Sequence, residues 1–237
     1  MKAIYKREVF SYFMTPIGYI YIGIFLSLGS LIFSLNNLSG LSSDMSDFFS
    51  MMSYVWMLLT PVLVMRLIAG ERKNLTDQLL MTAPVRAGDI VLGKYLAACT
   101  VLLISVAFSL LFPLLIALQG KIYPLELMTL YVGFILQGCA FIAFDLMLSS
   151  LSRNPVTAAV TAFGANLFLW LVTIATSASS SLLVRKLNDF FNLYDRFSPF
   201  LLGQLSIASI FFYLVFIALC LFIAAQILLS RRWAELS

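Results

Sequence analysis

Six long apolar runs constrain the fold of this chain more than any other feature of its sequence. A helix needs about 20 mostly apolar residues to cross the hydrocarbon core of a bilayer. The runs are continuously apolar and do not alternate, so they do not predict the strands of a membrane barrel. We therefore expect an all-α membrane protein with one transmembrane domain over residues 1–237. Its six transmembrane helices are expected at about residues 17–35, 51–68, 95–118, 127–150, 156–178 and 206–229.

Composition places the chain in lipid rather than in water. Only 11% of its residues are charged, whereas a soluble domain has about 25%. Its basic start, with Lys2 and Lys6, precedes an apolar run that is long enough to span and lacks a small-x-small cleavage site. We therefore interpret the first run as a retained span and not as a cleaved signal peptide.

The positive residues are distributed unequally between the two faces of the membrane. With six spans both termini lie on one side, which holds eleven Lys and Arg residues against four on the other. Because cytoplasmic connections are enriched in Lys and Arg, both termini are predicted to be cytoplasmic. The net charge of +4 is then a topology signal, and no nucleic-acid partner is expected. The eleven are Lys2, Lys6, Arg7, Arg66, Arg72, Lys73, Arg86, Lys94, Arg153, Arg231 and Arg232, and the four are Lys121, Arg185, Lys186 and Arg196.

Residues 1–16 are predicted to form an N-terminal interfacial helix. Tyr5, Val9 and Tyr12 share one helical face, and Pro16 ends the helix before the first span. The alternative is a basic flank that only sets the orientation of the first span.

Residues 71–84, ERKNLTDQLLMTAP, form a charged segment between two long apolar runs. Leu75, Leu79 and Leu80 give a short helix one apolar edge, and Pro84 ends it. Such an edge either rests on lipid headgroups or fits the groove of a partner protein.

Two residues after this segment are expected to help the third span begin. Asp89 is predicted to cap the N-terminus of the helix from Ile90 onward, at the positive end of its dipole. Lys94 is predicted to snorkel toward the membrane surface.

The connection at residues 179–205 is predicted to be an interfacial or re-entrant segment on the outer face. Aromatic residues favour the headgroup zone, and this connection places several of them on neighbouring helical faces. Pro199 and Gly203 would turn the chain back into the last span. The aromatic residues are Phe190, Phe191, Tyr194 and Phe197.

No motif in the sequence indicates catalysis, a cofactor or a metal. The chain has no histidine, no P-loop and no GxSxG or HExxH pattern. Cys99, Cys139 and Cys220 fall inside predicted spans without CxxC spacing, which favours helix packing over metal or redox chemistry. We therefore expect neither an enzyme nor a directly bound cofactor.

Asp145 is the least favourable residue in the predicted spans. A carboxylate at the centre of a span costs about 2.5–3.5 kcal/mol on insertion scales. It is interpreted as part of a pathway or interface, as a buried partner of Arg66 or Lys94, or as a carboxyl that is protonated or snorkels inward. Asn166 is a second candidate pathway or interface residue, although polar amides such as Asn166 and Gln137 commonly join helices.

Four stretches of the chain form a recognisable combination. They are KREVFSYFMTPIGYIYIGIFLSLGSLIF (6–33), MRLIAGERKNLTDQLLMTAPVRAGDIVLGKYLAA (65–98), DLMLSSLSRNPVTAA (145–159), and DRFSPFLLGQ with RRW (195–204 and 231–233). In this combination the chain resembles the permease subunits of type-2 ABC exporters, the ABC-2 family, and most of all the gliding-motility-type permeases. The resemblance covers most of the chain and is specific for the family, not for a substrate.

The resemblance implies that residues 71–84 are a coupling helix, which docks in a cleft of a separate cytoplasmic ABC ATPase. ATP and Mg²⁺ bind to that partner, and the N-terminal helix flanks it. A second six-span permease subunit, identical or different, and a bacterial cytoplasmic (inner) membrane are implied as well. The residues that match the coupling pattern are Glu71, Arg72, Lys73, Thr76, Leu79, Leu80 and Pro84.

The chain departs from the family pattern at three positions. Leu75 stands where the family usually has glycine. Gln78, which remains a candidate coupling residue, stands where the family has glutamate, so a possible salt bridge to the ATPase is lost. Asp145 stands where the family often has glycine, which makes it the residue most particular to this chain.

Three functions are compatible with the sequence. The first is a permease subunit that couples ATP hydrolysis by its partner to export of a substrate, or to mechanical signalling toward an envelope partner. The second is a stand-alone secondary transporter or channel that uses Asp145 and needs no ATPase. The third is a membrane scaffold without transport.

Overall fold

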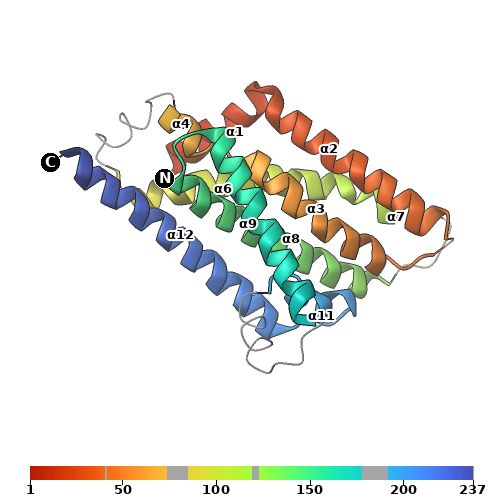
Figure 1. The fold of residues 1–237 in the computed structure, drawn as a ribbon. Coiled ribbons are helices and arrows are strands. Elements are labelled where there is room, and N and C mark those ends of the chain that lie inside the picture. Colours follow the sequence, from red (N-terminus) through yellow and green to blue (C-terminus); the bar gives the residue numbers. More distant parts are fainter. Residues whose placement is uncertain (41, 74–84, 119–122, 178–191, 237) are drawn as a thin grey trace.

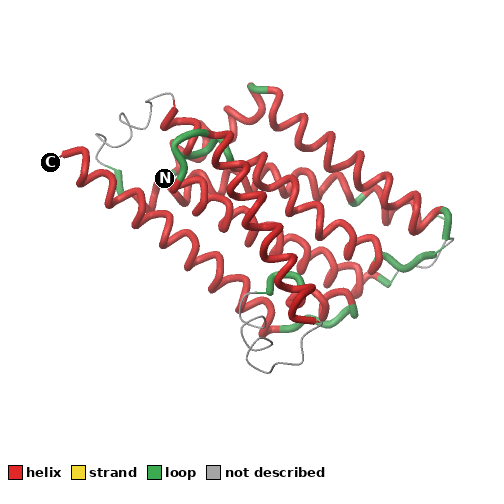
Figure 2. The backbone as a smooth tube through the Cα atoms, in the orientation of Figure 1, coloured by secondary structure: helices red, strands yellow, loops and turns green. Residues whose placement is uncertain are grey.

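The computed structural model describes residues 1–40, 42–73, 85–118, 123–177 and 192–236. Within these ranges the regular structure is entirely helical (Figures 1 and 2), which confirms the expected all-α fold. The elements are α1 (Lys2–Met14), α2 (Pro16–Phe33), the π-helix η1 (Ser34–Leu38), α3 (Ser46–Val64), α4 (Ala69–Lys73), α6 (Ala87–Ser109), α7 (Leu111–Ala117), α8 (Pro124–Leu151), α9 (Pro155–Ser177), the 3₁₀-helix η2 (Asp195–Phe197), α11 (Ser198–Leu201) and α12 (Ile207–Leu236).

Within the described ranges, six helical stretches are long and apolar enough to cross a membrane, as the sequence predicts. They are Pro16–Leu38, Ser46–Arg72, Ala87–Ala117, Pro124–Leu151, Pro155–Ala175 and Ile207–Arg231. The largest difference from expectation is the third stretch, which begins at Ala87 and not near residue 95. Arg86, and not Asp89, is the N-cap of α6, so that prediction is wrong. Asp89 lies in the first turn, where its carboxylate still faces the positive end of the helix dipole.

Prolines set the starts of several spans. Thr15 is extended and Pro16 is at the first turn of α2, where its missing N–H has no partner to lose. Pro124 begins α8 in the same way after an extended Tyr123. The break at Thr15 lets α1 turn sharply against α2 instead of continuing it (Figure 1).

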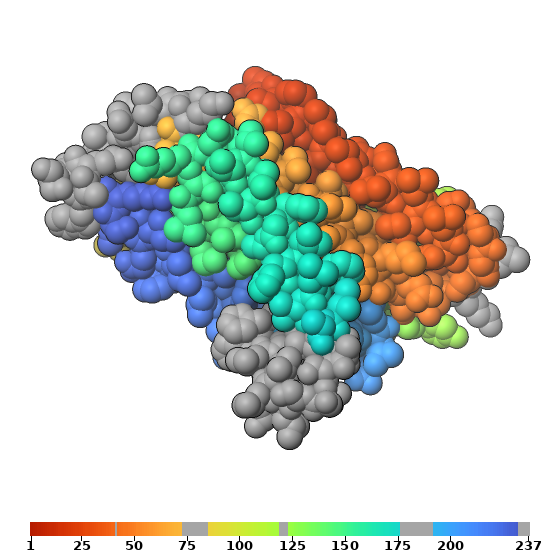
Figure 3. All heavy atoms as spheres, viewed as in Figure 1, coloured from red at the N-terminus to blue at the C-terminus, as the bar shows by residue number. Residues whose placement is uncertain are grey.

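The central helix of the bundle is α8, which packs against α3, α6, α9 and α12. By contrast, α9 forms the outer layer of one face (Figure 3), and only 17% of its most apolar stretch is buried in the protein. The start of the chain and the end of α12 lie at the same end of the bundle, as an even number of spans requires (Figure 1). We call this end, which holds α1, α4 and the turn at residues 152–154, the α1 end.

Aromatic side chains fill the space between α2, α3 and α8. The Phe25 and Trp56 rings stack with centroids 5.2 Å apart, and the Trp56 and Phe134 centroids are 4.5 Å apart. All three residues are buried. Each such pair contributes about 0.5–1.5 kcal/mol beyond the area it buries. Gly138 lets α6 approach this cluster, because a Cβ there would lie only 2.7 Å from Leu102 Cδ1.

The third span is interrupted at Leu110, between α6 and α7. Pro113 cannot donate an N–H to the Ser109 carbonyl four residues earlier, which weakens the helical ladder at this point. At the same residue, the Ser109 hydroxyl lies 3.3 Å from the Tyr131 hydroxyl of α8, which connects the interruption to the central helix.

Residues 192–206, the described part of the connection between the fifth and sixth spans, fold against the bundle. Tyr194 and Phe197 are buried, so their rings pack inside the protein. Gly203 has a φ of 70°, a left-handed conformation that glycine adopts without strain, and it turns the chain toward α12. Phe190 and Phe191 lie outside the described residues.

Candidate functional site

The candidate site lies at the α1 end, where α4 leads into the predicted coupling segment. Glu71, Arg72 and Lys73 are the final residues of α4. The described geometry therefore covers residues 71–73 and the residues from 85 onward, which we call the base of the segment. The predicted coupling residues Thr76, Gln78, Leu79, Leu80 and Pro84 lie outside the described residues.

Lys94 connects α6 to α4, the two helices on either side of residues 74–84. Its ammonium lies 2.7 Å from the Glu71 carboxylate and also donates a hydrogen bond to the Leu67 carbonyl. Glu71 comes before residues 74–84 and Lys94 comes after them, so this ion pair holds α4 against α6. The Lys94 side chain is only 2% exposed, and shielding from water strengthens the attraction between the two charges.

Helix α1 contributes an acid and a base to the same place. Glu8 lies 3.1 Å from the Lys94 ammonium and 2.7 Å from the Arg7 guanidinium. Arg7 also forms an ion pair with Glu71. Two carboxylates and two cations from α1, α4 and α6 therefore meet in one network. We call Arg7, Glu8, Glu71 and Lys94 the charge cluster.

The ionisation of Glu8 follows from its neighbours. Burial raises the pKa of Glu8, but Lys94 and Arg7 together outweigh burial and lower this pKa below its usual value. A carboxylate whose pKa is lowered on folding stabilises the fold while it is ionised. The contribution of Glu8 is therefore present above its unfolded pKa of about 4.3, and it is lost as the pH falls through the lowered folded value.

The structure corrects one prediction here. Lys94 does not snorkel, because it is 1% exposed and two carboxylates satisfy its charge inside the protein. The fully buried residues of α1 are Ile4, Glu8 and Tyr12. Tyr12 belongs to the predicted face, and Tyr5 and Val9 of that face are partly buried against the core. Sequence reasoning missed Glu8, although its position as the lone acid in a basic helix was a signal that this face meets protein.

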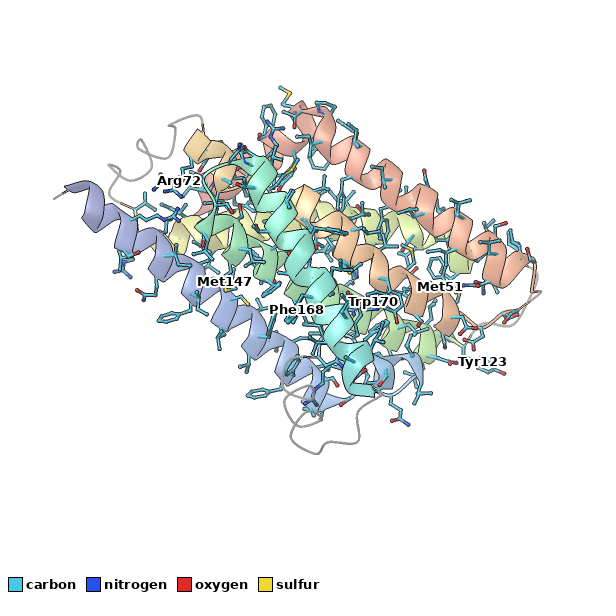
Figure 4. All side chains as sticks on the ribbon, viewed as in Figure 1. Met51, Arg72, Tyr123, Met147, Phe168 and Trp170 are labelled. Atoms are coloured by element: carbon cyan, nitrogen blue, oxygen red, sulfur yellow. The ribbon has the colours of Figure 1, made fainter. Side chains whose placement is uncertain are left out.

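Arg72 extends the base of the segment to the turn between α8 and α9. Its guanidinium donates a hydrogen bond to the Ser152 carbonyl at 3.2 Å. Arg231 of α12 donates to the neighbouring Leu151 carbonyl, also at 3.2 Å. Figure 4 shows Arg72 at the α1 end, with Met51 and Tyr123 at the opposite end of the bundle. The base of the segment is thus in contact with the fourth span as well as the second and third.

Asp145 forms a second polar site in α8, six residues before the helix ends at Leu151, and it is completely buried. The Asn166 amide of α9 donates a hydrogen bond to its Oδ1 at 3.0 Å, so the two residues join α8 to α9. The predicted pairing with a cation is wrong, because Lys94 belongs to the charge cluster and Arg66 forms no ion pair within the described chain. Asp145 Oδ2 and Asn166 Oδ1 accept no hydrogen bond from the described residues, although the Thr60 hydroxyl of α3, which donates to the Trp56 carbonyl, lies near the Asp145 carboxyl.

Replacing Asp145 by asparagine is expected to leave the protein at least as stable as the wild type. The amide keeps the acceptor for Asn166 and removes a group whose ionised form costs about 2.5–3.5 kcal/mol inside a membrane. The control variant Asp145→Leu leaves the Asn166 amide unpaired and should lose about 1–3 kcal/mol. Thermal unfolding in detergent measures both, and an Asp145→Asn variant as unstable as Asp145→Leu would contradict the pairing role.

Other chemistry is sparse in the part of the chain that the structure describes. It contains no group of three or more His, Cys, Asp or Glu residues that could hold a metal ion. Cys99, Cys139 and Cys220 are free thiols. The charge cluster can act mechanically, because it fixes α1, α4 and α6 together through ion pairs that are costly to break when they are buried.

Comparison with known proteins identifies the chain at the level of its family. The family described as ABC-2 family transporter protein matches residues 27–210, from α2 to the start of α12. No curated protein matches the chain. Subunits of this family normally work with an ATPase subunit. The match covers well over half of the sequence and includes both Glu71 and Lys94. With its six membrane-spanning helices, this chain therefore belongs to the ABC-2 transporter family and is a multi-pass permease subunit of an ABC transporter.

Proposed function

We propose that this permease subunit couples ATP binding and hydrolysis on a separate cytoplasmic ATPase to a conformational change across the membrane. Residues 71–84 dock in a cleft of that ATPase, which binds ATP and Mg²⁺. The observation that carries the proposal is the charge cluster, because it anchors the base of this segment on both sides. The output is export of a substrate or, as in the gliding-motility-type permeases that the chain resembles, mechanical signalling to an envelope partner.

A force on the segment would reach three membrane elements through the charge cluster. The second span ends at Arg72, Lys94 belongs to the third span, and Arg7 and Glu8 belong to α1 directly before the first span. Because ion pairs hold these elements together, displacement of the segment would move the ends of three spans as one body. Closure of the ATPase would thereby bias the permease between two arrangements of its spans.

The α1 end is proposed to face the cytoplasm, with the chain in the inner membrane of a bacterium and both termini inside. The described cations of α1, α4, the α8–α9 turn and α12 gather at this end, as the positive-inside rule expects. A second six-span subunit, identical or different, completes the membrane part of the transporter.

Leu79→Asp/Leu80→Asp is expected to abolish association with the ATPase. The two carboxylates would replace the apolar edge that fits the partner's cleft, and burying them unpaired is unfavourable. The measurement is co-purification of a P-loop ATPase with the detergent-solubilised chain from its native membrane.

Ser42→Asp/Ser43→Asp is the matched control, because it adds the same charge to exposed residues on the connection at the opposite end of the bundle. We expect this control to retain the ATPase. An ATPase that stays bound to the Leu79→Asp/Leu80→Asp variant, or that never co-purifies with the wild type, would overturn the proposal.

A stand-alone secondary transporter or channel is the second candidate, and the unpartnered Oδ2 of Asp145 favours it. Such a function needs an ionisable carboxyl in the span, so Asp145→Asn would abolish ion- or proton-dependent flux in proteoliposomes that contain no ATPase. Under the coupling proposal the chain alone shows no flux, and Asp145→Asn leaves ATPase association unchanged.

A further inference from the structure

A polar groove lies beside the charge cluster, and the coupling mechanism requires no ligand in it. It is bounded by α1, the start of α2 and the residues that follow α3, and its volume is about 290 Å³. This volume is near the lower limit of ligand pockets, so the groove suits a group the size of a lipid headgroup. Besides three residues of the charge cluster, its polar lining includes Ser11, Thr15 and Arg66.

The charges in the groove and directly behind it sum to one excess positive charge. Glu8 and Glu71 are the two carboxylates that line it, and both are paired with Arg7 and with Lys94 behind them. Arg66 is exposed and has no hydrogen bond or ion pair to any described residue. Three cations therefore face two carboxylates, and the unpaired charge belongs to Arg66.

The free donors in the groove match a phosphate group. The planar guanidinium of Arg66 presents several N–H groups in a fork that suits the oxygens of a phosphate. Ser11 is exposed, and its hydroxyl has no described partner. The Thr15 hydroxyl is already used, since it donates to the Ser11 carbonyl at 2.8 Å. Arg66 and Ser11 are thus the residues that would hold the anion.

An apolar stripe begins at the groove and follows the first span. Ile17 lines the groove, and Ile20, Ile24 and Leu31 continue on the same face of α2 at intervals of three, seven and fourteen residues. Their exposed fractions are 52%, 43% and 61%. Helix α2 runs along the edge of the bundle away from the α1 end (Figure 1). A phosphate site at the start of a span, continued by an exposed apolar stripe, is complementary to an amphiphile.

We propose that this groove binds the phosphate headgroup of one anionic phospholipid, whose acyl chains lie along α2. Basic pockets between membrane helices on the cytoplasmic side bind anionic headgroups in this way. The excess charge of Arg66 selects an anionic lipid over a zwitterionic one. This site is independent of the ATPase, so its test and the test of the coupling proposal can fail separately.

The test is lipid binding to the purified, delipidated full chain in detergent, measured by native mass spectrometry. Phosphatidylglycerol, phosphatidylcholine and inorganic phosphate are titrated separately. We expect one phosphatidylglycerol to bind to each wild-type chain in preference to phosphatidylcholine. Arg66→Gln should weaken this binding by about tenfold or more, because a charge-assisted hydrogen bond is lost. Arg153→Gln, the matched control at an exposed arginine of the same end, should leave the binding unchanged.

A second variant keeps the proposal falsifiable if Arg66→Gln perturbs the fold. Ser11→Asp places a carboxylate in the groove from an exposed position, and we expect it to abolish preferential binding of phosphatidylglycerol while the unfolding temperature without lipid stays unchanged. Equal binding of both lipids, equal losses in Arg66→Gln and Arg153→Gln, or full binding to Ser11→Asp would overturn the proposal. Inorganic phosphate that displaces phosphatidylglycerol at similar concentrations would show a free-anion site and overturn the assignment to a lipid.

Discussion

Replacing Lys94 by methionine is expected to lower the free energy of unfolding by about 3–5 kcal/mol. Methionine keeps most of the side-chain volume, so the loss reports the missing charge. Without the ammonium, the largely buried carboxylates of Glu8 and Glu71, which are 11% and 17% exposed, keep as a shared partner only Arg7, whose side chain is 51% exposed. Unfolding of the full chain in mixed detergent micelles measures the change. The variant should also bind the ATPase more weakly, because α4 is no longer held against α6.

Two controls separate the charge of Lys94 from its packing. Lys94→Arg retains the charge and should lose much less stability than Lys94→Met. The double variant Lys94→Met/Glu8→Gln also removes the charge of one of the two carboxylates that lose their pairing with Lys94, and it should recover part of the lost stability. A Lys94→Met variant as stable as the wild type would show that the charge cluster does not hold these helices together.

The pH dependence provides an independent check of the same network. Burial raises the pKa of Glu8, but Lys94 and Arg7 together lower it in the folded protein. The stabilisation due to Glu8 is therefore lost as the pH falls below about 4.3. In Lys94→Met the largest cause of the lowered pKa is gone, so the acid-dependent loss of stability should be smaller than in the wild type.

Replacing Gly133 by valine is expected to lower the free energy of unfolding by about 3 kcal/mol, the upper end of the usual cost of overpacking. A Cβ at Gly133 of α8 would lie 2.5 Å from Cγ and 2.7 Å from Cβ of Phe200. Phe200 is completely buried in α11, and these atoms are at the root of its side chain, so a rotamer change cannot make room. The substitution should therefore push α11 and the start of the last span away from α8, which thermal unfolding would detect.

Gly164→Val in α9 is the matched control, because a Cβ at this position meets no atom within 4 Å. We expect its stability to stay within about 0.5 kcal/mol of the wild type, as for other surface substitutions. Equal effects of the two substitutions would mean that the loss arises from replacing a helical glycine and not from contact with Phe200.

The surroundings of residues 71–84, the proposed coupling segment, were only partly predictable. The resemblance to ABC-2 permeases pointed to Glu71 and Arg72, and both lie at the end of α4 with partners outside it: Lys94 of α6 and the turn between α8 and α9. Glu8 was missed because its partner Lys94 is 86 residues away in the sequence, and no local pattern connects the two. Lys94 itself was expected to reach the membrane surface, since its burial becomes favourable only when α1 and α4 bring carboxylates to it.

The sequence by itself determined the helical class, the six spans and their order. These follow from local quantities, because a helix that crosses lipid must satisfy its own backbone and needs a minimum apolar length. The tertiary structure alone decided that Glu8 faces Lys94, that Asn166 and not a cation pairs with Asp145, and that Phe200 occupies the space left by Gly133. These contacts depend on how each helix is rotated and how it crosses its neighbours. In an apolar chain, hydrophobicity leaves that rotation largely undetermined, because lipid and protein interior are similarly apolar.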